Sequence, residues 1–115
     1  MVAIVWQIDV RPSQTEEFER FYGADGPWTK LSRKSRSFLG SSFLKDIVHD
    51  SRYLLVEYWS EMVIYEKHVE DFRSDLRTLE TERAQFVLKM ESVGLFNALN
   101  VPSRSGPTWS RRSGK

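Results

Sequence analysis

Alternating apolar and polar positions predict four strands in this chain. Residues 2–10 place Ile4, Trp6, Ile8 and Val10 on one face, and the opposite face also begins with apolar side chains. We therefore expect a central strand that is covered on both faces. Similar patterns predict three further strands, at residues 38–47, 53–59 and 88–99. A short polar turn joins the second and third of the four strands, which predicts a hairpin.

Apolar residues at helical spacing predict a helical region after the first strand. Ser13 and Glu16 have the spacing of a capping box, and an apolar stripe that ends at Tyr22 follows them. Gly26 and Pro27 interrupt this stripe, so we expect a second short helix to begin at Pro27.

A second helical region is predicted after the hairpin. Ser60 is the expected N-cap. Apolar residues follow at helical intervals, namely Val69, Phe72, Leu76, Leu79 and Phe86. Residues 71–74 are expected to break this region into two helices.

The order of these elements predicts the fold class. The order β-α-β-β-α-β, with extra short helices, is the ferredoxin-like arrangement of the α+β class, built on an antiparallel sheet. Its helices cover one face of the sheet, and the strands of this chain are apolar on both faces. We therefore expect a homodimer in which a second copy covers the free sheet face.

The charge distribution separates a body from a tail. Residues 101–115 hold four basic side chains and no acidic one, whereas the rest of the chain holds 13 basic and 16 acidic side chains. We interpret residues 1–100 as the folded domain and residues 101–115 as a basic, mobile tail. The body lacks the excess of positive charge that nucleic-acid binding requires, so we expect no nucleic-acid partner.

The start of the chain and its hydropathy bear on its location. Residues 1–9 lack the basic and apolar regions of a signal peptide, and no apolar run approaches the ~20 residues of a membrane span. The sequence has no cysteine, which fits a reducing compartment. We expect a cytoplasmic protein without a membrane partner.

The sequence carries no recognisable motif for a metal or a cofactor. It has only two histidines, His49 and His68, and no clustered carboxylates beside them. It also lacks a glycine-rich phosphate loop, a nucleophile elbow and a zinc-protease motif. We therefore expect no metal site and no bound cofactor.

Three segments resemble a known family. They are residues 22–31 (YGADGPWTKL), 38–44 (FLGSSFL) and 53–60 (YLLVEYWS), with Tyr65 six residues after Trp59. Together they resemble the antibiotic biosynthesis monooxygenase family of the dimeric α+β barrel superfamily. The resemblance covers residues 2–99 and implies a ferredoxin-like monomer, a homodimeric barrel and a small apolar pocket between sheet and helices. The family's activities include cofactor-free oxygenation of polyphenols and haem degradation, so the fold alone does not define the chemistry.

The haem-degrading branch of that family has a recognisable trio of residues. It combines an Asn on the first strand with a Trp and a His in the second helical region. Here the first strand has Val5, Trp6 and Gln7, and the second helical region has His68 but no Trp. We therefore expect no haem degradation.

Aromatic side chains are the candidates for a ligand pocket. Trp59 and Tyr65 would recognise a flat aromatic ligand by stacking and by a phenol hydrogen bond. Trp28 and Tyr22 would close the pocket from the first helical region, and we include Phe72 from the second. The alternative for all five residues is ordinary packing in the core.

Two of the candidate residues carry groups that can act in catalysis. His68 would be a general base if its ring points into the pocket, and Tyr65 would supply a phenol hydroxyl. The alternative for His68 is a structural or half-exposed histidine. Asp9, Glu57 and Gln7 lie on strand faces, where a buried side chain could abstract a proton or pair across a dimer interface. The helix face with Glu80, Glu82 and Arg83 is expected to be solvated.

Two functional hypotheses follow. In the first, the protein is a cofactor-independent monooxygenase that acts on a small aromatic or polyketide-like molecule. In the second, it is a non-catalytic dimeric module that binds a hydrophobic ligand or a protein partner. A pocket that contains a titratable side chain favours the first hypothesis, and a pocket without one favours the second.

Overall fold

The computed structural model describes residues 1–99, so the predicted tail at residues 101–115 lies outside the described part of the chain. The elements are β1 (Val2–Val10), the 3-10 turn η1 (Pro12–Gln14), α1 (Thr15–Tyr22), α2 (Pro27–Ser32), β2 (Phe38–Lys45), β3 (Arg52–Trp59), α3 (Met62–Asp71), α4 (Arg73–Arg83) and β4 (Val87–Asn97). Among the described residues, no helix has the length and apolar character to cross a membrane.

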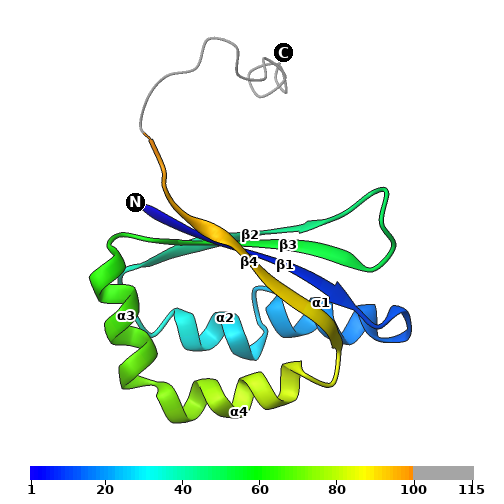
Figure 1. Cartoon of the computed structure of the whole chain (residues 1–115). Helices are drawn as coiled ribbons and strands as arrows, with labels where there is room; N and C mark the ends of the chain where they lie inside the picture. Colours follow the sequence, from blue (N-terminus) through cyan, green and yellow to red (C-terminus); the bar gives the residue numbers. More distant parts are fainter. Residues whose placement is uncertain (100–115) are drawn as a thin grey trace.

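The four strands form one antiparallel sheet. Their order is β2-β3-β1-β4, so β1 is a central strand as predicted. All helices lie on one face of this sheet (Figure 1). This is the ferredoxin-like α+β fold that the order of elements predicted.

The core lies between the sheet and α1. Phe18 of α1 is fully buried, and its ring lies 4.9 Å from the ring of Tyr53, 5.2 Å from that of Tyr22 and 5.6 Å from that of Phe43, measured between centroids. Ile8 of β1 pairs in register with Tyr53 and is also fully buried. This end of the interface is therefore filled with aromatic and aliphatic side chains.

Both predicted helix caps are wrong. Pro12 begins a 3-10 turn, and α1 then starts at Thr15 with Gln14, which makes no side-chain cap bond, in the cap position. Ser60 does not cap α3, because its hydroxyl pairs with the Ser37 hydroxyl at 2.5 Å and ties the end of β3 to the start of β2. At α1 the preceding turn displaces the predicted cap, and at α3 a distant hydroxyl takes the side chain that was expected to cap the helix.

No element among residues 1–99 covers the face of the sheet opposite the helices (Figure 1). On this face Leu44 of β2 lies beside Leu54 of β3, and Phe96 of β4 lies beside Ala3 of β1. Leu44 is 50% exposed and Phe96 is 48% exposed. The two edge strands thus present large apolar side chains to solvent on the face away from the helices.

Candidate functional site

Two adjacent spaces lie between the sheet and the helices, beside the core. The outer pocket has a volume of about 320 Å³, and Trp6, Tyr22, Trp28, Leu55, Glu57, Tyr65, Glu80, Arg83 and Met90 line it. The inner chamber has a volume of about 80 Å³, and Trp28, Ser32, Glu57, Trp59, Tyr65, His68, Val69, Leu76 and Glu80 line it. Four residues therefore form the boundary between the two spaces: Trp28, Glu57, Tyr65 and Glu80.

The centre of this boundary is Glu57. It lies on the helix-facing side of β3, in register with Ile4, and only 5% of its surface is exposed. The indole Nε1 of Trp28 donates a hydrogen bond of 2.8 Å to Glu57 Oε2. Burial raises the pKa of Glu57, and both the Trp28 hydrogen bond and the charge of Arg83 oppose this rise. Glu57 is therefore a buried carboxyl group that accepts protons more readily than an exposed glutamate does.

The turn before α2 positions Trp28. Gly26 packs against the end of α1, so closely that a side chain there would overlap the backbone oxygens of Arg20 and Phe21. Pro27 then begins α2, as predicted, because its fixed φ suits the first turn of a helix. Trp28 follows directly and reaches Glu57 on the sheet.

Arg83 closes the outer pocket from the end of α4. Its Nη1 donates a hydrogen bond of 2.9 Å to the hydroxyl of Tyr22, and its guanidinium carbon lies 4.9 Å from the centroid of the Trp28 ring. Arg83 is half-buried, so the expectation of a fully solvated helix face is wrong at this residue. The pocket thus places a positive charge opposite a buried acid.

The two tyrosines of the pocket remain neutral at physiological pH. Burial raises the pKa of Tyr22 to about 12, although Arg83 opposes the shift. Burial also raises the pKa of Tyr65 to about 12. Both phenols are therefore available as hydrogen-bond donors rather than as bases.

The structure brings most of the sequence candidates together. The rings of Trp59 and Tyr65 meet edge to face at 5.2 Å, and the ring of His68 lies 5.0 Å from that of Trp59. These three residues line the inner chamber, Tyr22 lines the outer pocket, and Tyr65 and Trp28 line both spaces.

Phe72 takes a different position. It lines neither space, and it packs instead behind the His68 ring at 4.9 Å, with Lys34 Nζ 5.7 Å from the centroid of its own ring. The candidates Asp9 and Gln7 also lie away from the pocket, and Asp9 forms an ion pair of 2.7 Å with Arg52.

Sequence reasoning missed five lining residues of the outer pocket: Trp6, Leu55, Glu80, Arg83 and Met90. One signal could have found two of them. Leu76, Glu80 and Arg83 are spaced by four and three residues, so they share one helix face with an apolar side chain that points inward. Within residues 1–99, no three His, Cys, Asp or Glu side chains gather as a group that could hold a metal ion.

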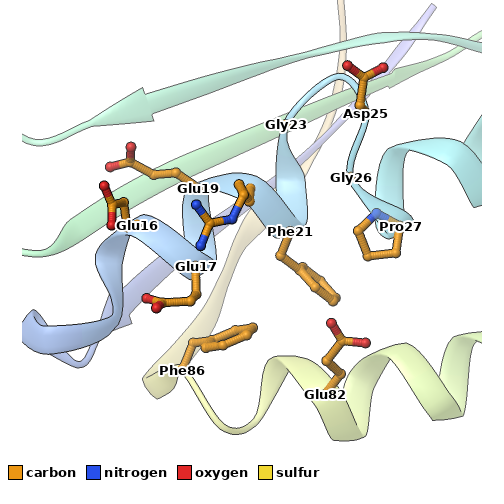
Figure 2. A pocket seen from close by; sticks show the side chains of 11 residues that line it. Glu16, Glu17, Glu19, Phe21, Gly23, Asp25, Gly26, Pro27, Glu82 and Phe86 are labelled. Carbon is orange, nitrogen blue, oxygen red and sulfur yellow. The ribbon is translucent and has the colours of Figure 1, made fainter.

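A wider hollow than these two spaces is a different feature. It is an open groove of about 710 Å³ between α1, the turn before α2, and α4 (Figure 2). Phe21 and Phe86 meet inside it at 6.0 Å, and exposed carboxylates surround it, namely Glu16, Glu17, Glu19, Asp25 and Glu82. Because none of these carboxylates is buried, the groove lacks the shielded acid that distinguishes the outer pocket.

Comparison with solved structures supports the fold. SnoaB, a cofactor-independent oxygenase from Streptomyces nogalater, superposes with a TM-score of 0.67 at 16% identity, over 87% of this chain and 94% of that one. Two proteins named as antibiotic biosynthesis monooxygenases also match. The one from Nitrosomonas europaea has a TM-score of 0.67 at 17% identity, over 86% of this chain and 99% of the other. The one from Caulobacter crescentus has a TM-score of 0.68 at 15% identity, over 86% and 90%.

These matches define the structural class. No protein-family profile matches the chain, and no curated protein matches it in sequence. The chain has the fold of the antibiotic biosynthesis monooxygenases, as its sequence motifs predicted. At these identities the likeness concerns the fold and leaves the substrate open.

Proposed function

We propose that this protein is a cofactor-independent oxygenase that binds a small aromatic, polyketide-like molecule in the outer pocket. One observation carries the proposal: a buried acid, Glu57, faces a pocket with aromatic walls and a cation, Arg83. The pocket volume of about 320 Å³ is at the lower end of the range for small-molecule sites. SnoaB, which shares the fold, is named as an oxygenase of this type.

The residues suggest how such a reaction proceeds. Ionised Glu57 accepts a proton from a carbon or hydroxyl of the substrate that is conjugated with a carbonyl group. The positive charge of Arg83 stabilises the enolate that forms, and the neutral hydroxyl of Tyr65 donates a hydrogen bond to it. The electron-rich carbon then bonds to dioxygen. The resulting peroxide takes up a proton. The reacting carbon then loses its remaining hydrogen as the O–O bond breaks, so that water leaves and a new carbonyl group forms on the substrate.

The experiment uses Glu57→Gln, with oxygen consumption and tryptophan fluorescence as separate readouts. Gln keeps an oxygen that accepts the Trp28 hydrogen bond but cannot take up a proton. With 1,8-dihydroxyanthrone as a probe, we expect the variant to bind, as seen by quenching, and to lose about 100-fold or more in oxygen consumption. Glu82→Gln, an exposed acid on the same helix as Arg83, is the matched control. The proposal fails if neither this probe nor other flat phenols quench the wild type, or if both variants turn over equally.

We also propose that the protein is a homodimer joined through the free sheet face. The support is the row of large apolar side chains on that face, which includes Leu44 and Phe96. A second copy that packs its own sheet there would remove these side chains from water. The pocket lies on the helix side of the sheet, so its lining residues come from one chain.

A further inference from the structure

Two residues that line the inner chamber each have a buried polar atom without a hydrogen-bond partner among the described residues. These atoms are the indole Nε1 of Trp59 and the imidazole Nδ1 of His68. Trp59 is 1% exposed and His68 is 5% exposed, so bulk water does not reach these groups. Because buried polar groups in folded proteins are nearly always hydrogen-bonded, two such atoms on residues of one chamber indicate a binding site for a small polar molecule.

The chamber has the size and lining for that partner. Its volume is about 80 Å³, and both unpaired residues line it together with Glu57 and Ser32. One water molecule occupies about 30 Å³ in the liquid and needs two to four polar neighbours when it is buried. The chamber therefore has room for one or two water molecules. It is too small for the aromatic ligand that the outer pocket fits.

Two aromatic rings pack against the His68 ring. The centroid of the Trp59 ring lies 5.0 Å from that of His68, and the centroid of the Phe72 ring lies 4.9 Å from it. Phe72, which does not line the chamber, thus acts as the support of a residue that does. An imidazole held in this way offers its Nδ1 to one fixed position.

Charged groups approach the chamber from three elements. Glu57 reaches it from β3, and Glu80 reaches it from α4, where Arg83 also acts on Glu57. On α3 itself, Asp71 is the charge that acts on His68, and Lys34 lies beyond Phe72. Burial lowers the pKa of His68, against the opposing effect of Asp71, and burial raises the pKa of Glu57. The two groups are thereby brought closer in proton affinity than a free histidine and a free glutamate.

We propose that the inner chamber is a buried water site, and that its water carries a proton from Glu57 to His68. The water accepts a hydrogen bond from Trp59 Nε1 and donates one to His68 Nδ1, which requires the His68 tautomer with its proton on Nε2. When Glu57 has taken a proton from a substrate, it passes a proton to the water, and the water passes one to Nδ1. One proton moves, the water is regenerated, and Glu57 is again ionised. The proton transfer rests on the proposed role of Glu57 as the base, whereas the water site does not depend on that role.

A crystal structure at atomic resolution tests the water site. We expect ordered solvent within hydrogen-bond distance of both Trp59 Nε1 and His68 Nδ1. A dry chamber, or a chamber filled by a side chain, overturns the proposal. This arm needs no substrate, so its result is independent of whether the protein is an oxygenase.

Nuclear magnetic resonance of the histidine rings tests the link to Glu57. The chain has two histidines, so the His49→Gln variant leaves His68 as the only signal. We expect nitrogen shifts of a neutral ring whose Nδ1 carries no proton. We also expect Glu57→Gln, added to this variant, to lower the pKa of His68, because it removes a negative charge across the chamber. Glu82→Gln should leave that pKa unchanged. A His68 titration that is the same with and without Glu57, in folded protein, overturns the relay even if the Glu57→Gln variant has lost its oxygen consumption.

Discussion

The hydrogen bond from Trp28 to Glu57 is the contact whose removal tests the description of the site most directly. In Trp28→Phe, an aromatic ring remains but the indole N–H that donates at 2.8 Å is absent. A hydrogen bond to a neutral acceptor contributes about 0.5–1.5 kcal/mol, and one to a charged acceptor contributes about 1.5–3 kcal/mol. The negative charge on Glu57 therefore adds about 1 kcal/mol to the free energy of this hydrogen bond.

A double-mutant cycle isolates that part. Glu57→Gln keeps a neutral acceptor for Trp28, so the changes in packing and in the neutral hydrogen bond cancel between the two sides of the cycle. We expect a coupling free energy of about 1 kcal/mol at pH 8 and close to zero at pH 4. In a domain of this size, 1 kcal/mol corresponds to about 4–8 °C in melting temperature.

The sign of the pH dependence follows from the raised pKa of Glu57. At low pH the carboxyl is protonated in the folded and unfolded chain alike, and its burial carries little penalty. As the pH rises above the ordinary value of 4.5, the unfolded chain loses this proton first, so the free energy of unfolding falls until the folded group ionises as well. The hydrogen bond from Trp28 lowers the pKa of Glu57, so it narrows the pH range between the ionisation of the unfolded and the folded carboxyl group. Trp28→Phe widens this range, and the variant therefore loses more stability at pH 8 than at pH 4.

Urea unfolding of the four proteins at both pH values measures the cycle. The ion pair with Arg52 lowers the pKa of Asp9, so Asp9 affects stability at lower pH than Glu57 does, and it does so equally in all four proteins. A coupling that is zero at pH 8, or equal at the two pH values, would refute the view that Glu57 is a buried carboxyl held by Trp28.

Two further predictions concern the turn that positions the site and the assembly. Gly26→Ala should destabilise the fold by at least ~2 kcal/mol, because the new Cβ would overlap backbone oxygens of α1. Gly23→Ala, whose Cβ would lie 3.1 Å from the Glu19 backbone oxygen, should cost less. Equal melting temperatures of the two variants would contradict this prediction. Sedimentation at micromolar concentration should give about twice the chain mass of 13.5 kDa. The double variant Leu44→Glu with Phe96→Glu should sediment at the mass of one chain. A wild type that sediments as a folded monomer would disprove the dimer.

Much of the fold could be predicted from the sequence because it depends on local pattern. The alternation in β1, the interruption at Gly26 and Pro27, and the order of elements all follow from neighbouring residues, and the structure reproduces them. The cap predictions were wrong because a capping side chain competes with other contacts that the local pattern does not show. Pro12 starts a turn before Ser13 can cap a helix, and Ser60 finds a hydroxyl partner 23 residues away.

The site could be predicted only in part. Trp59 and Tyr65 are close in sequence, and their contact could be anticipated from a strand that runs into a helix. The contact between Arg83 and Tyr22 joins residues 61 positions apart and depends on how α4 lies against α1. The alternation of β3 shows which face Glu57 is on, but not that Trp28 covers it.

Glu57 also supplies the strongest physical reason to look for chemistry at this site. On the helix-facing side of β3, its neighbours Leu55 and Trp59 are apolar and buried, and an apolar residue at position 57 would avoid the cost of burying an acid. A buried carboxyl with one hydrogen bond is weak as a stabilising device, because replacing such groups by apolar ones is often neutral or favourable. Its position in a pocket that also holds Arg83 gives the acid a use that packing does not. Glu57 is thus costly for stability but lies where an acid can act on a ligand, and this favours the enzyme hypothesis over the binding-module hypothesis.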